Sequence, residues 1–418
     1  MNSKSKIIFG LATLTLIICL GLRFSSQINQ ELLAVERASH QLATVILTHS
    51  FKSVGDLKTR YDLALANPAN KKVRVLIVPG HEPNYGGAEY GNLKERVLVE
   101  QLAQDLKRFL QNNPHFEVFV TRDSQTWSPD LANYFQNHWA EIVEWRQASR
   151  NETNQLIALG SMPPLQAQVS HSRAKADVAT RLWGITKWAN ENNIDVTIHL
   201  HLNDYARPAT GQPGRYSGLA IYVPTSQYGN SPTTKAVAQN IFNRLAKYNS
   251  VSDLSGERTG LVEEPDLIAI GAKNSSNAAS LLIEYGYIYE PQFTNPQLRE
   301  LALKDLAYQT YLGLQDFFEP NSAVRLTKTD DTLLLPHDWQ PTKSGNETPT
   351  KDIFALQTAL MLEGEYPPAG KNKNDCPRTG VLGPCTKSAL LAFQTKKGIN
   401  GENGLVGEKT LTVLKQLY

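Results

Sequence analysis

Three apolar segments that each end in a polar side chain constrain the fold of this chain more than any other feature. These segments are Val75–His81, Thr197–His201 and Leu281–Glu284. Short apolar runs bounded by glycine or polar residues are typical of strands buried in a sheet. Because parallel strands end at the same edge of a sheet, we expect His81, His201 and Glu284 to gather at one rim.

A fourth polar residue, Glu95, follows His81 after a loop that is long enough to return to the same rim. Two histidines, one carboxylate and an open position form a catalytic zinc arrangement, and a spare glutamate is a ready general base. Glu95 also fits a simpler interpretation, in which its carboxylate complements the dipole at the start of a helix. His199 lies two residues before His201 on the same side of the strand, so either histidine could be the ligand.

Strand-like and helix-like segments alternate between residues 71 and 319. The expected strands are Arg74–Val78, Glu117–Thr121, Asp195–His201, Leu219–Val223 and Ser280–Ile283. The expected helices are Glu95–Asn112, Ala174–Asn192, Thr233–Tyr248 and Asn295–Phe318. This order predicts an α/β fold with a twisted, mostly parallel sheet flanked by helices on both faces. Residues 124–171 do not follow this alternation and are expected to form a helical insert. The insert is either a lid or partner-binding element, or it packs on the domain without such a role.

The N-terminus combines a basic start with an apolar run. Residues 7–22 carry no charge, and Lys4, Lys6 and Arg23 flank them. This predicts a transmembrane signal anchor over residues 1–24, with the rest of the chain outside the cell membrane. A cleaved signal peptide is the alternative, although no small-x-small site follows the run. Residues 25–70 are expected to be helical, either as a stalk or as a helix packed on the next domain.

Composition and charge limit the classes of partner. The chain is 41% hydrophobic and 20% charged, with a net charge of +2. These values are ordinary for a globular protein and give no basis for nucleic acid binding.

The C-terminal region has two parts. Residues 320–350 are rich in proline and small polar residues and are expected to form a linker, whereas 351–418 form a compact helical unit. Its cysteines, Cys376 and Cys385, are expected to form a disulfide outside the membrane, with two free thiols as the alternative. Each Gly-x-x-Gly turn is followed by a threonine that is expected to cap the next helix.

Between Val73 and Phe318, the motifs resemble those of a zinc-dependent N-acetylmuramoyl-L-alanine amidase. The motifs are Gly80-His81, Gly86-Gly87-Ala88, Glu95-Arg96, Thr121-Arg122-Asp123, Asp195–Asn203 and Leu281–Ile288. The family histidine has an aspartate six residues before it and an asparagine two residues after it, which selects His201 over His199. Departures from the pattern are Glu82-Pro83, His199 and the long insert.

The resemblance implies a site and a reaction. His81, Glu95 and His201 would bind Zn²⁺, and Glu284 would take a proton from the attacking water. The bond cut would join N-acetylmuramic acid to the L-alanine of the peptidoglycan stem peptide. Residues 71–319 would then be the catalytic domain.

Residues 351–418 resemble a small peptidoglycan-binding domain, so the expected partners are peptidoglycan and, through the N-terminal helix, the membrane. Two other functions stay open at this point. The chain could be a non-catalytic wall-binding or regulatory protein with a degenerate amidase fold. It could also be a zinc peptidase that cuts within the stem peptide, because pocket shape sets substrate choice.

Overall fold

The computed structural model describes residues 52–67, 71–167, 169, 174–271, 275, 278–320, 328–342 and 348–418. The predicted membrane anchor at 1–24 and most of the predicted stalk lie outside these ranges. No helix within these ranges is both long and apolar enough to cross a membrane.

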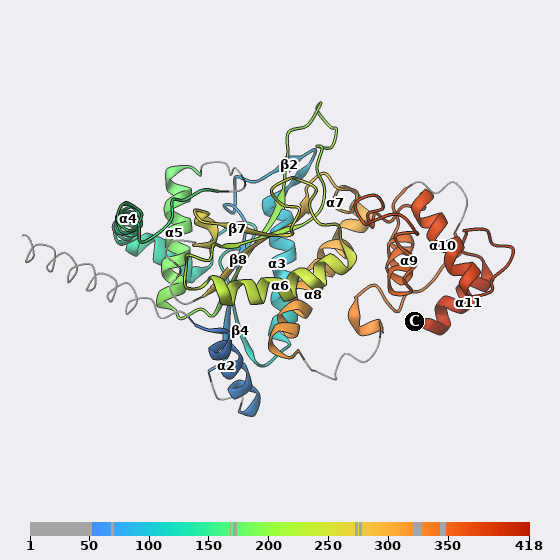
Figure 1. Ribbon diagram of the computed structural model, residues 1–418, viewed down its shortest axis with the longest axis horizontal. Helices are drawn as coiled ribbons and strands as arrows, with labels where there is room; N and C mark the ends of the chain where they lie inside the picture. Colours follow the sequence, from blue (N-terminus) through green and yellow to red (C-terminus); the bar gives the residue numbers. More distant parts are fainter. Residues whose placement is uncertain are drawn as a thin grey trace, which may run out of the picture. The chain divides into compact units, whose positions relative to one another are not determined.

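A six-stranded sheet forms the centre of the larger part of the chain (Figure 1). In sheet order, the strands are β4 (Phe116–Val120), β1 (Val73–Pro79), β5 (Val196–Asn203), β8 (Ala279–Tyr287), β6 (Ala220–Pro224) and β7 (Leu261–Glu264). All neighbours pair in parallel except β6 and β8, which are antiparallel. The predicted α/β fold with a mostly parallel sheet is therefore confirmed.

Two strand features were not expected from the sequence. One is the edge strand β7, and the other is a small antiparallel hairpin of β2 (Glu89–Tyr90) and β3 (Leu93–Lys94). Both are short and carry charged residues, so neither produces an apolar run. The hairpin directly precedes the helix that begins at Glu95.

Helices cover both faces of the sheet because side chains alternate along each strand. One face packs against α3 (Glu95–Gln111), α6 (Ser231–Tyr248) and α8 (Pro296–Phe318). The opposite face packs against α5 (Ala176–Glu191), with Leu76 and Val78 of β1 buried beside Trp183. Each large apolar side chain fully buried in these layers contributes about 1.5–3 kcal/mol of transfer free energy. The shorter elements are α2 (Val54–Ala66), α7 (Pro291–Thr294), η1 (Ile268–Ile270) and η2 (Lys328–Asp331).

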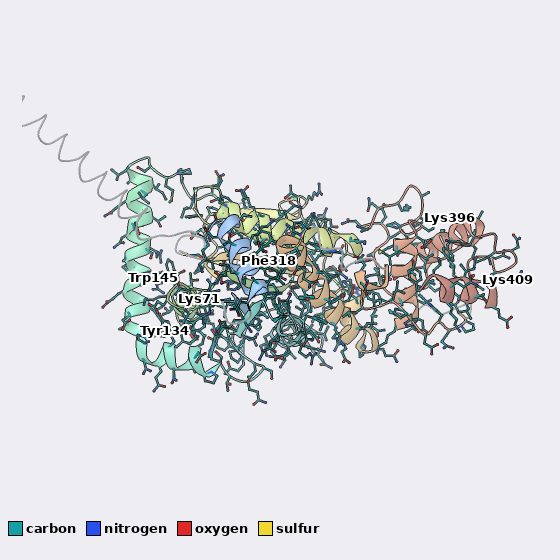
Figure 2. The ribbon with its side chains drawn as sticks, turned by 90° about the horizontal axis from the view of Figure 1, so that it is seen from below. Lys71, Tyr134, Trp145, Phe318, Lys396 and Lys409 are labelled. Atoms are coloured by element: carbon teal, nitrogen blue, oxygen red, sulfur yellow. A yellow bond between two sulfur atoms is a disulfide. The ribbon has the colours of Figure 1, made fainter. Side chains whose placement is uncertain are left out.

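The insert folds mainly as one long helix, α4 (Pro129–Ala158), which kinks at His138. Tyr134 and Trp145 project from it (Figure 2). The Tyr134 hydroxyl donates to Glu191 of α5 across 2.6 Å, and the Trp145 ring meets Trp183 edge-on, with ring centroids 5.6 Å apart. The expected helical character of the insert is confirmed, whereas its role as a lid or partner-binding element stays a prediction.

At the end of the sheet where the parallel strands begin, a buried carboxylate pairs with two partly exposed cations. The Asp195 side chain, just before β5, is fully buried and lies 2.6 Å from Lys52 Nζ and 2.9 Å from Arg60 Nη1. It also accepts a hydrogen bond from the Arg74 backbone N–H. These contacts fasten α2 and the segment before it to the sheet.

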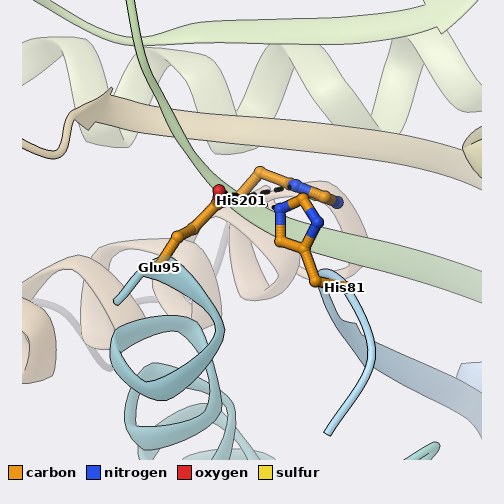
Figure 3. Close-up of side chains that lie close together, drawn as sticks. All are labelled: His81, Glu95 and His201. Atoms are coloured by element: carbon orange, nitrogen blue, oxygen red, sulfur yellow. Dashed lines mark hydrogen bonds and ion pairs between the residues drawn. The ribbon is translucent and has the colours of Figure 1, made fainter. Parts of the chain in front are cut away.

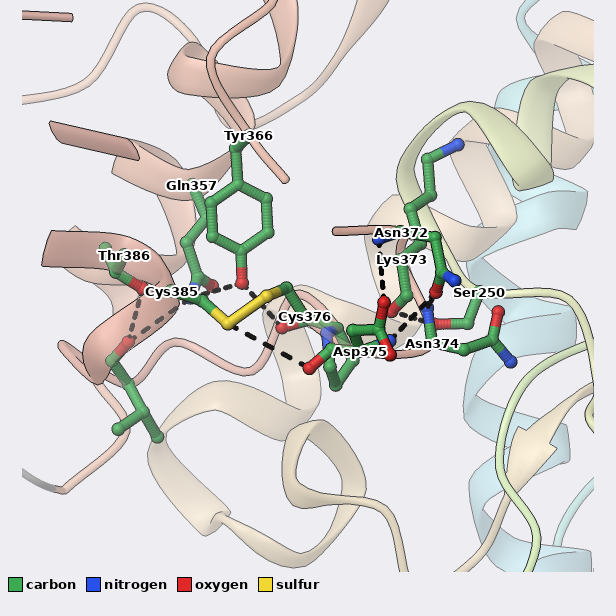
Figure 4. Close-up of a disulfide and its surroundings, with 12 residues drawn as sticks. Ser250, Gln357, Tyr366, Asn372, Lys373, Asn374, Asp375, Cys376, Cys385 and Thr386 are labelled. Atoms are coloured by element: carbon green, nitrogen blue, oxygen red, sulfur yellow. Dashed lines mark hydrogen bonds between the residues drawn. A yellow bond between two sulfur atoms is a disulfide. The ribbon is translucent and has the colours of Figure 1, made fainter. Parts of the chain in front are cut away.

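The C-terminal unit contains α9 (Lys351–Leu362), α10 (Pro384–Lys396) and α11 (Glu408–Leu417). A disulfide joins Cys376, in the loop after α9, to Cys385 in the first turn of α10 (Figure 4). The predicted cysteine pairing is thus present. Buried Arg378 donates to the equally buried Asp305 of α8 across 2.7 Å.

A glutamine bridges turn and helix in this unit. Gln357 on α9 accepts from the Gly380 backbone N–H at 2.8 Å and donates to the Thr386 hydroxyl at 2.9 Å. The amide therefore ties the glycine turn to the start of α10.

The same arrangement recurs between α10 and α11. Gln394 accepts from the Gly404 backbone N–H at 2.8 Å and donates to Thr410 at 2.9 Å. The prediction that the threonines cap these helices is wrong: Gly383 and Gly407 are the N-caps. The threonine hydroxyls lie inside the first turn and are held by the glutamine amides.

Candidate active site

His81 follows β1 in a tight turn with a left-handed backbone. Its φ angle is 70°, a conformation that costs a non-glycine residue free energy unless the surroundings hold it. Buried Arg122, after β4, supplies the restraint. Its Nε donates to the backbone carbonyls of His81 at 2.9 Å and Pro79 at 3.2 Å, and its Nη2 donates to that of Gly80. The guanidinium therefore fixes the turn that presents the imidazole.

Glu95 is the first residue of α3, and only about 3% of its surface is exposed. One carboxylate oxygen, Oε2, accepts from the Ala88 backbone N–H at 2.8 Å, and the other, Oε1, accepts from that of Leu202 at 3.1 Å. Two backbone donors therefore set the plane of the carboxylate. Its expected position at a helix start is confirmed, and the carboxylate also faces the two histidines.

His201 lies near the carboxyl end of β5, where the neighbouring residue on β8 is Glu284. A Cβ atom at Gly80 would lie only 2.3 Å from the His201 ring. Glycine is therefore required at position 80 because a side chain would not fit there, and not because the backbone conformation demands it. The turn after β1 and the ring of His201 pack against each other with no room for a methyl group.

The three predicted ligand residues converge on one point (Figure 3). His81 Nε2 lies 2.8 Å from Glu95 Oε2, and His201 Nδ1 lies 3.0 Å from Glu95 Oε1. One candidate ligand atom from each residue lies within 4.8 Å of the others. Burial opposes ionisation of Glu95, but the two histidines outweigh it and hold its pKa well below the usual range. Two imidazole nitrogens and a carboxylate oxygen are a donor set that suits zinc.

Glu284 stands beside this group with an unpaired oxygen. Its Oε2 atom is buried and has no hydrogen-bond partner within the part of the chain that the structure describes. Burial, then repulsion from Glu95 and Glu257, raises its pKa well above the ordinary value. Burying a carboxylate without a hydrogen-bond partner costs folding free energy. This indicates that Glu284 is present for function rather than for stability.

Glu257 forms the centre of a polar network next to Glu284. It accepts hydrogen bonds from the side chains of Tyr222, Ser252 and Asn203, the last at 3.0 Å. Asn203 lies two residues beyond His201 on β5. The network therefore anchors the strand end that carries His201. No motif in the sequence indicated a role for Glu257.

The two unusual neighbours of the ligand residues do not join the cluster. His199 is buried further back on β5, and burial, with His201 nearby, lowers its pKa to about 3, so the imidazole is neutral. Glu82 turns away and pairs with Arg181 Nε of α5 at 2.9 Å. The geometry thus brings His201, not His199, to Glu95, in agreement with the motif spacing.

Arg122 is the residue whose importance the sequence understated. In the sequence, Arg122 is only part of a motif at a strand end, yet its guanidinium also donates to the carbonyls of Asp123 at 3.0 Å and Arg96 at 3.1 Å. An arginine directly after an apolar strand was the available signal. Its partners are backbone carbonyls, which sequence patterns do not reveal.

Comparison with known families connects this region to a class of enzymes. Residues 147–316 match the model of the family described as N-acetylmuramoyl-L-alanine amidase, Amidase_3. Residues 147–316 are therefore similar to this family, in agreement with the resemblance inferred from the motifs. The match contains His201 and Glu284 and begins after His81 and Glu95. No curated protein matches the sequence.

Solved structures with a related chain path include three bacterial proteins. The CwlD amidase of Clostridioides difficile, in complex with the GerS lipoprotein, is 14% identical (TM-score 0.38; 60% of this chain, 100% of that one). An N-acetylmuramoyl-L-alanine amidase from Clostridium difficile 630 is 18% identical (0.37; 60% and 99%). Ami1 of Mycobacterium smegmatis is 11% identical (0.37; 59% and 99%). Similarity this low carries no information about the chemistry of this chain.

Proposed function

We propose that this protein is a zinc-dependent N-acetylmuramoyl-L-alanine amidase that hydrolyses the amide between N-acetylmuramic acid and L-alanine in peptidoglycan. The observation that carries the proposal is the convergence of His81, Glu95 and His201 beside the unpaired Glu284. The family match over residues 147–316 supports the same reaction.

The residues present fit a zinc ion. His81, Glu95 and His201 would hold it through two nitrogens and one oxygen, and the three-residue set leaves room for water or substrate. A zinc ion bound there would supply acidity to a water molecule and would polarise the substrate carbonyl. The hydrogen bonds from Ala88 and Leu202 to Glu95 would keep the carboxylate oriented.

Glu284 would act as the general base and then as the general acid. Neighbouring strands lie about 4.8 Å apart, so the pairing of Glu284 with His201 places its carboxylate next to the ligand group. Glu284 would accept the proton of the attacking water and pass it to the nitrogen of the leaving L-alanine. Its unpaired Oε2 atom has no competing hydrogen bond to give up before it takes that proton.

The proposal includes a location and a second binding part. The apolar N-terminal run with its flanking lysines supports export and anchoring in the membrane. The Cys376–Cys385 disulfide supports an oxidising environment outside the cytoplasm. We assign peptidoglycan binding to residues 351–418 on the motifs of the sequence.

The full-length protein should be incubated with purified peptidoglycan, with and without a zinc chelator, and the products identified by mass. We expect free stem peptides that begin with L-alanine, and we expect the chelator to abolish them. Glu284→Ala should lower the rate by at least about 10²-fold, because a general base contributes roughly 10²–10⁴.

A matched change, Glu144→Ala, alters an exposed glutamate on α4 and should leave the rate unchanged. Products cut within the stem peptide would instead identify a peptidase. No release by folded, zinc-loaded protein would indicate a wall-binding protein without activity.

A further inference from the structure

A surface groove of about 420 Å³ lies directly beside the His81 turn. The residues after His81 form one wall, and the loop before α4 forms another. Its lining includes Pro83, Tyr85, Gln125 and Trp127. Since the second wall leads into α4, the insert at 124–171 contributes to the groove.

The groove is balanced in charge. Only Glu82 and Arg181 are charged among its lining residues, and they pair with each other at 2.9 Å. Arg181 Nη2 also donates to the Tyr85 hydroxyl at 3.1 Å and to Asp177 at 2.5 Å. The guanidinium is therefore already engaged and leaves no free cation for an anionic ligand.

The remaining lining combines aromatic rings with small polar groups. Trp127 and Tyr85 are partly exposed, whereas Asn84, Gln125 and Thr126 are exposed. Flat rings offer apolar contact to the C–H face of a ring-shaped ligand, and amide and hydroxyl groups match its hydroxyls. This chemistry suits an uncharged, polyhydroxylated ring.

We propose that this groove binds a saccharide unit of the glycan strand next to the muramoyl residue whose amide is cut. This inference rests on the proposed function and extends its substrate from one sugar to a longer strand. Continuity of the chain supports it, because Glu82 and Pro83, which line the groove, directly follow the candidate ligand His81. The stem peptide carries charged groups. The groove offers them no partner, because its two charged residues, Glu82 and Arg181, already pair with each other.

Direct binding tests the groove without relying on catalysis. Chitotetraose, a tetramer of N-acetylglucosamine, should be titrated calorimetrically into full-length Glu284→Gln protein with and without Trp127→Ala. We expect Trp127→Ala to weaken one binding event at least about tenfold, the equivalent of about 1.4 kcal/mol. Binding by the C-terminal unit would persist in both proteins, so their difference reports the groove.

Two further variants control for a loss of binding that is caused by misfolding. Trp145→Ala changes a tryptophan of the same insert that does not line the groove, and it should leave the titration unchanged. Trp127→Phe keeps an aromatic ring and should restore most of the affinity. Thermal melting of each variant shows whether the fold survives.

Identical titrations with and without Trp127 would overturn the groove assignment even if the protein hydrolyses peptidoglycan. A difference confined to Trp127 variants would support the groove even if no hydrolysis is observed. The two proposals therefore fail separately.

Discussion

The Arg122 guanidinium donates to the backbone carbonyl of His81 across 2.9 Å, and so a residue that follows β4 holds the turn that follows β1. The same side chain reaches the carbonyls of Pro79 and Gly80. Burial lowers the pKa of Arg122 to about 10, which still leaves the guanidinium charged at neutral pH. Its role is to position the His81 imidazole rather than to contact substrate.

Replacing Arg122 by lysine should weaken zinc binding while the protein remains folded. Lysine keeps the charge but has one nitrogen in place of the fork that serves several carbonyls. We expect the zinc affinity to fall by about 10–100-fold, the usual effect of losing a group that orients a ligand. Competition with a chromophoric chelator measures this affinity without reference to activity.

Arg150→Lys changes an exposed arginine on α4 and provides the control for Arg122→Lys. An unchanged zinc affinity in Arg122→Lys, with normal thermal stability, would show that the turn holds itself. A parallel loss in both variants would point to a general effect of arginine replacement.

The sequence predicted the strands that end in polar residues, and with them the approach of His81, His201 and Glu284. The strand pattern alone left both His199 and His201 open, and only the resemblance to the amidase family favoured His201. Apolar runs and polar strand ends are local signals, so these predictions needed no tertiary information.

The restraints around the candidate site were not predictable in the same way. The contacts of Arg122 depend on a left-handed backbone at His81, which no residue type specifies. Glu257, from a distant loop, contacts the site through the hydrogen bond that it accepts from Asn203. Such contacts join segments far apart in the chain through groups that look like ordinary polar residues in sequence.

Gly80→Ala should abolish zinc binding through steric pressure alone. The added Cβ would lie 2.3 Å from the His201 ring, a distance that cannot be accommodated without moving the ring or the turn. Overpacking of this kind costs about 1–3 kcal/mol and displaces a ligand. Zinc content after dialysis and the unfolding midpoint in urea give the two readouts.

Gly55→Ala, in the first turn of α2, is the matched control because its nearest contact would be 3.6 Å away. It should bind zinc normally. Full zinc occupancy in Gly80→Ala would mean that His201 can shift without leaving the ligand group.

Glu284→Gln should stabilise the zinc-free protein while removing activity. The pKa of Glu284 is raised in the folded state by burial and by Glu95 and Glu257. The folded protein therefore binds this proton more tightly than the unfolded chain, and the cost of ionisation appears as the pH rises. At pH 7 we expect a gain of about 0.5–2 kcal/mol in the free energy of unfolding, the usual size of a single stabilising substitution.

The sign of this effect can be checked by pH. As the pH falls, Glu284 in the wild type becomes protonated, so the stability advantage of the Gln variant disappears and the two unfolding curves should converge. Urea denaturation in the presence of a chelator at pH 7 and pH 5 measures the difference. A larger difference at pH 5 than at pH 7 would contradict the raised pKa.

Asp195→Asn should destabilise the fold and leave the zinc site intact. The Asp195 carboxylate is fully buried between Lys52 and Arg60, whose side chains are 20% and 21% exposed. Breaking a fully buried pair costs about 3–5 kcal/mol, but water reaches both cations here, so we expect about 1–3 kcal/mol. Urea unfolding measures the loss, and Asp62→Asn, an exposed change on α2, is the control.

Since Asp195 precedes β5 and His201 lies near its carboxyl end, zinc affinity should not change. A fall in zinc affinity at constant stability would show that the two ends of β5 are coupled.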